Sequence, residues 1–130
     1  MQIYTYILIC AVGLGACVHD KDDARLMREA AAMHNEAIQT AAKLEDTLYI
    51  LAMDTVLQDS ARLYMEAIET WKEDLVEVPG NETDHHGDLH HHHESAGKYS
   101  ITATEMVAVQ KTLKATIDSI AAQVRRFRDN

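Results

Sequence analysis

The sequence predicts an all-α protein in which three amphipathic helices pack as an up-down-up bundle. Apolar side chains recur at alternating steps of three and four residues in three separate stretches, which is the spacing of one buried helix face. After residue 16, Gly and Pro occur only between residues 79 and 97, where they predict a loop. None of the helices would be stable alone in water, whereas a bundle buries all three apolar faces.

The first helix is expected to run from Asp22 to a turn near Asp54. Its apolar face consists of Met27, Ala30, His34, Ala37, Ala41, Leu44, Leu48 and Leu51. The repeat changes phase between Met53 and Val56, which favours a turn there, because one helix continuing to Glu77 would be about 80 Å long. The alternative is that long helix in an elongated two-helix hairpin, packed as a dimer.

The second helix follows this turn, with Asp54 or Asp59 as candidate N-cap residues. Its apolar face consists of Leu57, Ala61, Tyr64, Ile68, Trp71 and Leu75. Trp71 is expected to anchor the core with its indole N–H turned toward a polar edge. Pro79 disfavours helix at the residue before it, and Gly80 permits a tight turn, so the helix should end there.

The third helix has a clear start signal, the capping box Thr102-Ala103-Thr104-Glu105. Ile101 is placed to pack against Met106 across this cap. The apolar face consists of Met106, Gln110, Leu113, Ile117, Ile120, Val124 and Phe127. Basic side chains in the later turns suit the negative end of the helix dipole, and the helix is expected to end at Phe127 or Arg128.

Two kinds of side chain on these faces are expected to belong to the core. His34 lies on the apolar face of the first helix and is expected to be hydrogen-bonded inside the bundle. The methionines are spread at helical spacing and are expected to fill the core; they are Met27, Met33, Met53, Met65 and Met106.

Residues 1–16 predict a signal peptide, because residues 3–17 are apolar apart from Thr5 and too short to span a bilayer. Leu14-Gly15-Ala16-Cys17 resembles the lipobox of bacterial lipoproteins. The resemblance implies that Cys17 carries lipid, palmitate included, and that residues 17–21 link it to a helical domain over residues 22–130. A plain secretory signal and a retained helix are the alternatives. Cys10 would be removed, which leaves no disulfide.

The net charge of −9 belongs wholly to the chain after Cys17. An acidic surplus argues against binding nucleic acid or an anionic membrane surface. Only the lipid is therefore expected to hold the protein to a membrane. The chain also lacks a Gly-rich phosphate loop and a Gly-x-Ser-x-Gly elbow, so we expect no enzyme.

Six histidines fall within nine residues of the predicted loop, which spans residues 79–100. Imidazoles bind zinc, copper and nickel, and four of them can complete a zinc shell. The candidate ligands are His85, His86, His90, His91, His92 and His93, with Asp84, Asp88, Glu94 and His19 as candidate co-ligands. The alternatives are a solvated loop with incidental metal binding and a pH-sensing role.

Three stretches of the chain carry a family resemblance: Trp71-Lys72-Glu73-Asp74-Leu75-Val76-Glu77-Val78-Pro79-Gly80, then a His-rich run, then Ile101-Thr102-Ala103-Thr104-Glu105-Met106. In this order they resemble a family of small, poorly characterised bacterial lipoproteins. The resemblance implies anchoring in the bacterial outer membrane, on its periplasmic or cell-surface side, and no particular activity. We expect a lipid-anchored envelope protein that binds or buffers divalent transition metals. The alternative is a helical structural or interaction lipoprotein, with a protein partner or a homodimer, that binds metal incidentally.

Overall fold

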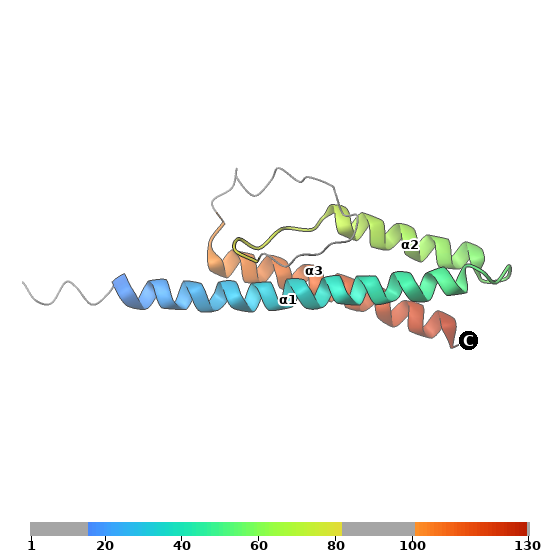
Figure 1. The fold of residues 1–130 in the computed structure, drawn as a ribbon, viewed down its shortest axis with the longest axis horizontal. Coiled ribbons are helices and arrows are strands. Elements are labelled where there is room, and N and C mark those ends of the chain that lie inside the picture. The colour runs from blue at the N-terminus through green and yellow to red at the C-terminus, as the bar shows by residue number, and fades with distance from the viewer. Residues whose placement is uncertain (1–15, 82–100, 130) are drawn as a thin grey trace, which may run out of the picture.

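Three helices form the protein in a computed structural model that describes residues 16–81 and 101–129. They are α1 (Ala16–Leu51), α2 (Gln58–Glu73) and α3 (Ala103–Arg128). α2 runs back along α1, and α3 runs in the same direction as α1 and packs along it (Figure 1). The predicted all-α, up-down-up three-helix bundle is confirmed.

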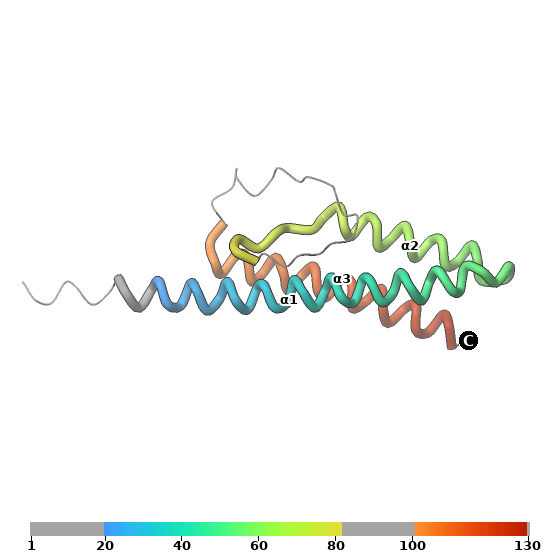
Figure 2. The backbone as a smooth tube through the Cα atoms, viewed as in Figure 1, coloured from blue at the N-terminus to red at the C-terminus, as the bar shows by residue number. Residues whose placement is uncertain are grey.

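α1 is longer than the sequence pattern predicted. It begins at Ala16 rather than at Asp22, so residues 17–21, expected to be a linker, are continuous with the helix. From residue 20 to Leu51, the backbone of α1 is one uninterrupted helical tube (Figure 2). The physical reason is that no Gly or Pro occurs between Ala16 and Leu51 to interrupt the helix. The apolar repeat could not indicate this extension, because the added turns project beyond the part of α1 that packs on α3 (Figure 1).

The turn near Asp54 is confirmed, and the single long helix is excluded. α1 ends at Leu51, and the Asp54 carboxylate accepts a hydrogen bond from the backbone N–H of Val56 at 2.8 Å. The N-cap prediction was wrong. The N-cap position of α2 is Leu57, without a side-chain hydrogen bond, because Asp54 serves the turn and Asp59 lies inside the first helical turn.

The core follows the three predicted apolar faces. Most side chains of the three faces are fully buried, and the others, such as Tyr64 and Ile120, are half-buried. The buried apolar set is Ala30, Ala37, Ala41, Leu44, Leu48, Ala61, Ile68, Trp71, Val78, Ala103, Met106, Val107, Leu113, Ile117 and Val124. Met53, expected in the core, is instead 68% exposed, because it lies in the turn after α1 has ended.

Trp71 joins α2 to α3 through a buried hydrogen bond. Its ring is 3% exposed, and its indole N–H donates to the backbone carbonyl of Leu113 at 2.9 Å. The expected polar edge was therefore wrong, although the core position was right. A helical carbonyl has a second lone pair, so Leu113 can accept the indole N–H while keeping its place in α3.

Lysine ion pairs cross the other two helix interfaces, between α1 and α2 and between α1 and α3. Lys72 of α2 binds Glu45 of α1 and, at 3.0 Å, Glu69 of its own helix. Partial burial lowers the pKa of Lys72, but the hydrogen bonds to Glu45 and Glu69 outweigh it and raise that pKa above its ordinary 10.5. Lys114 of α3 lies 2.8 Å from Asp118 and 3.6 Å from Glu36 of α1.

The capping box at the start of α3 is confirmed. Thr102 Oγ1 accepts from the backbone N–H of Glu105 at 3.2 Å, and the Glu105 carboxylate accepts from the backbone N–H of Thr102 at 2.9 Å. The hydrogen bond from the Thr102 backbone lowers the pKa of Glu105 below its ordinary 4.5. Ile101 packs on the cluster that contains Met106, as the sequence predicted.

Candidate functional site

The predicted metal ligands lie outside the described residues. They are His85, His86, His90, His91, His92 and His93, with the candidate co-ligands Asp84, Asp88 and Glu94. Cys17 and His19 belong to the first turns of α1. Over residues 16–81 and 101–129, no group of three or more His, Cys, Asp or Glu side chains is placed to hold a metal ion.

The chain that leads into the His-rich region is held firmly on the bundle. Residues 75–81, here called the strap, follow α2 in an irregular path and run alongside α1 and α3 toward the start of α3 (Figure 1). The strap turns at Pro79 and Gly80, where the Asn81 N–H donates to the Val78 carbonyl at 3.0 Å and Gly80 has φ 76°. Proline followed by a residue at positive φ is the geometry of a type II turn.

Val78 fastens the strap to a small apolar cluster between α1 and the start of α3. Its side chain is 3% exposed and lies with Ala30 of α1 and Met106 and Val107 of α3. Ile101, on the far side of the His-rich region, packs on the same cluster. Both flanks of residues 82–100 are therefore fixed against the N-terminal half of α1.

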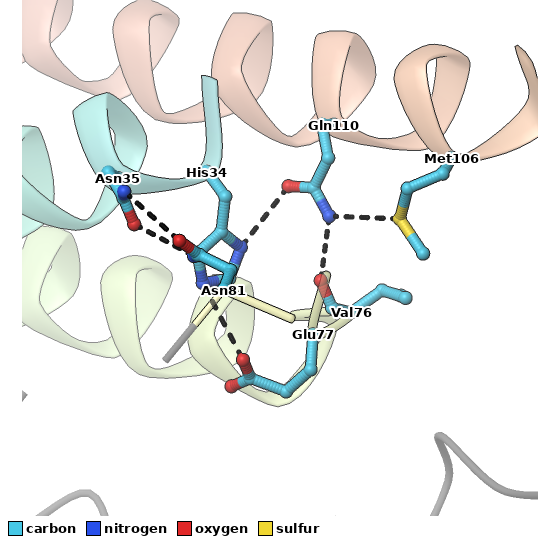
Figure 3. Close-up of polar contacts among 7 residues, drawn as sticks. All are labelled: His34, Asn35, Val76, Glu77, Asn81, Met106 and Gln110. Carbon is cyan, nitrogen blue, oxygen red and sulfur yellow. Dashed lines mark hydrogen bonds and ion pairs between the residues drawn. The ribbon is translucent and has the colours of Figure 1, made fainter. Parts of the chain in front are cut away.

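A buried polar cluster lies beneath the strap. His34 of α1 and Gln110 of α3 are the two buried polar side chains in the described part of the chain. Gln110 Nε2 donates to the backbone carbonyl of Val76 at 2.6 Å and approaches Met106 Sδ at 3.6 Å. Gln110 Oε1 lies 3.3 Å from His34 Nδ1 (Figure 3). One amide thus connects both long helices with the strap.

These contacts fix the tautomer of His34. If the Gln110 amide were reversed, its oxygen would face the Val76 carbonyl oxygen, and two acceptors would meet at 2.6 Å. The oxygen must therefore face His34, and Nδ1 must carry a hydrogen to donate to it. In a neutral imidazole, this leaves the lone pair on Nε2.

Glu77 of the strap faces that second ring nitrogen. Its Oε2 lies 3.9 Å from His34 Nε2, and the carboxylate is largely exposed whereas the imidazole is buried (Figure 3). Glu77 lies beside α1 because the strap is attached to that helix through Val78, which packs with Ala30, and through Asn81.

A reciprocal amide pair completes the contact between the strap and α1. Asn81 Nδ2 donates to Asn35 Oδ1 at 2.9 Å, and Asn35 Nδ2 donates to Asn81 Oδ1 at 3.3 Å (Figure 3). Asn35 follows His34 directly. The last described residue before the His-rich region is therefore attached next to the buried histidine.

Sequence reasoning found His34 and missed its partner. Gln110 was assigned to the apolar face of α3 without a role. The available signal was that each long helix has one polar side chain within an otherwise apolar face, His34 on α1 and Gln110 on α3. Buried polar groups are generally hydrogen-bonded, so two such interruptions on facing helices predict a pair.

The described helices give no sign of a membrane span, since none of them combines sufficient length with sufficient hydropathy. Comparisons of the chain with protein-family models, with characterised proteins and with solved structures gave no match.

Proposed function

We propose that this protein is a lipid-anchored envelope protein that binds divalent transition metals through its His-rich segment. The observation that carries the proposal is the density of six histidines within residues 85–93, flanked by Asp84, Asp88 and Glu94. Imidazole suits zinc, copper and nickel, and the carboxylates add oxygen donors and negative charge. Cys17, at the start of α1, is the proposed lipid attachment point in the outer membrane.

The fold supports this proposal at the two ends of the His-rich segment. Both flanks of the segment are attached to one cluster, through Val78 before it and Ile101 after it. Fixed ends lower the chain entropy lost when a metal closes the segment on itself.

Calorimetric titration of residues 18–130 with zinc, copper and nickel tests the proposal. All buried side chains described here come after residue 29, so this chain keeps the whole core. We expect binding tighter than about 100 μM, and only weaker binding when the six histidines are replaced by asparagine. The matched control replaces Asp84, Asp88 and Glu94 by asparagine or glutamine, which should weaken binding less.

The outcome that would overturn the proposal is equal metal affinity with and without the six histidines. Acidification gives an independent check, because protonated imidazoles cannot bind metal. Zinc uptake that is unchanged between about pH 7.5 and about pH 5 would contradict ligation by side chains whose ordinary pKa is about 6.5.

A second candidate, an interaction protein, is favoured by a different observation. The end of α1 and the turn after it expose apolar side chains: Tyr49 and Ile50 in the helix and Met53 and Val56 in the turn are between 63% and 85% exposed. Several exposed apolar side chains within a short stretch of chain favour a protein contact. This candidate predicts that the protein's role survives deletion of residues 84–94 and is lost on Ile50→Glu, whereas metal binding predicts the reverse.

A further inference from the structure

The contact between His34 and Glu77 brings together two acceptors that need a proton or a metal cation between them. The hydrogen on Nδ1 is committed to Gln110 Oε1, so the neutral ring presents a lone pair at Nε2. The Glu77 carboxylate, 3.9 Å away, accepts only. Two acceptors that face each other are stabilised by a positively charged group between them.

We propose that His34 Nε2 and Glu77 Oε2 are ligands of a divalent transition metal, in a site separate from the His-rich segment. Zinc binds imidazole nitrogen at about 2.0–2.1 Å and carboxylate oxygen at about 2.0–2.2 Å, so an ion fits between atoms 3.9 Å apart at a wide angle. The exposed Glu77 side chain has room to move inward by a few tenths of an ångström, toward a tetrahedral angle.

The surroundings of His34 match those of a metal-binding histidine. Such a ring usually donates its second N–H to a carboxylate, a carbonyl or water, which fixes the tautomer and the ring orientation. The Gln110 amide oxygen does this for His34, and its own orientation is fixed by Val76 and Met106. The nitrogen that would bind the metal is thus held in a buried, rigid frame (Figure 3).

The exposure of the two ligands defines the kind of site. His34 is 2% exposed and cannot move far, whereas the Glu77 side chain is 65% exposed, so the ion would enter from the solvent side of the strap. The pair supplies two protein ligands, and water fills the remaining positions. Such a site binds weakly and exchanges its metal readily, in contrast to a closed structural zinc site.

Nitrogen NMR of the His34 ring tests this site directly. In a chain with His19 and the six histidines of residues 85–93 replaced by asparagine, His34 gives the only imidazole signals. Zinc titrated at about pH 7.5 is expected to shift the Nε2 resonance and to leave Nδ1 protonated. Glu77→Gln is expected to weaken zinc binding at least about tenfold. Glu73→Gln, an exposed carboxylate at the end of α2, should leave it unchanged.

Three outcomes would overturn the inference. They are an Nε2 signal that does not respond to zinc up to about 1 mM, an equal loss of affinity in Glu77→Gln and Glu73→Gln, and an Nε2 that carries a proton throughout the titration. The last result would mean that a proton joins the two groups. Calorimetry on the chain with all its histidines separates this site from the His-rich segment. If that chain binds metal, but His34 does not respond to zinc in the chain without the other histidines, only the His-rich segment binds metal.

Discussion

Replacing Gln110 by leucine is expected to lower the free energy of unfolding by about 2–4 kcal/mol. The leucine leaves the buried Nδ1–H of His34 without an acceptor, which costs about 1–3 kcal/mol. It also removes the bond to the Val76 carbonyl, worth about 1 kcal/mol, although Val76 is partly exposed and its carbonyl can turn to water. The apolar surface of the leucine offsets part of this loss.

The decisive measurement is a double-mutant cycle. His34→Leu alone leaves the Gln110 oxygen buried without a donor, which again costs about 1–3 kcal/mol. The combined variant His34→Leu/Gln110→Leu leaves neither group unpaired, and an apolar pair of similar volume can be nearly neutral. We therefore expect the double variant to be more stable than the sum of the single losses predicts, by about 1–3 kcal/mol.

Urea unfolding, followed by circular dichroism and by fluorescence, measures each corner of the cycle. Trp71 is the only tryptophan and is buried against α3, so its emission reports the bundle. Losses that simply add, within about 0.5 kcal/mol, would refute the reasoning, because they would mean that His34 and Gln110 do not depend on each other.

Three further predictions test other parts of the fold. Ile117→Ala, at a side chain without exposed surface, should cost about 2–5 kcal/mol, whereas Ile50→Ala, at an exposed position, should change the free energy of unfolding by less than about 0.5 kcal/mol in urea. Gly80→Ala should cost about 1–2 kcal/mol because φ is 76°, and an unchanged thermal midpoint would contradict this turn geometry. Because folding lowers the pKa of Glu105, its stabilisation is complete above the ordinary value of 4.5 and is lost as the pH falls through the lower folded value. Glu105→Gln, which can keep the hydrogen bond to Thr102, should therefore lose less stability than the unchanged protein between about pH 5 and about pH 3, as urea unfolding would show.

The helical faces were predictable because burial in a bundle repeats with the helix. His34, Ile68 and Ile117 were each assigned to an apolar face from spacing alone, and each is buried. The capping box at Thr102 and Glu105 was predictable for a related reason, since both partners lie within one turn and need no distant contact.

The predictions failed where a side chain had a choice of partners. Asp54 had the right chemistry for a helix cap, but its carboxylate accepts the backbone N–H of Val56 inside the turn. The Trp71 indole was expected at a polar edge and found the Leu113 carbonyl inside the bundle. The partner of Asp54 depends on the path of the turn, and that of Trp71 on how α2 packs on α3. Apolar spacing specifies neither.

The sequence by itself determined the all-α class, the three buried faces, the turn near Asp54, the start of α3 and the location of the histidine cluster, because helical period and capping chemistry act over a few neighbouring residues. Only the tertiary structure decided that the strap is attached to α1, that Gln110 fixes the tautomer of His34, and that Glu77 faces its other nitrogen. His34 is 76 residues from Gln110 in the chain, and such a pair exists only once helix packing has brought the two faces together.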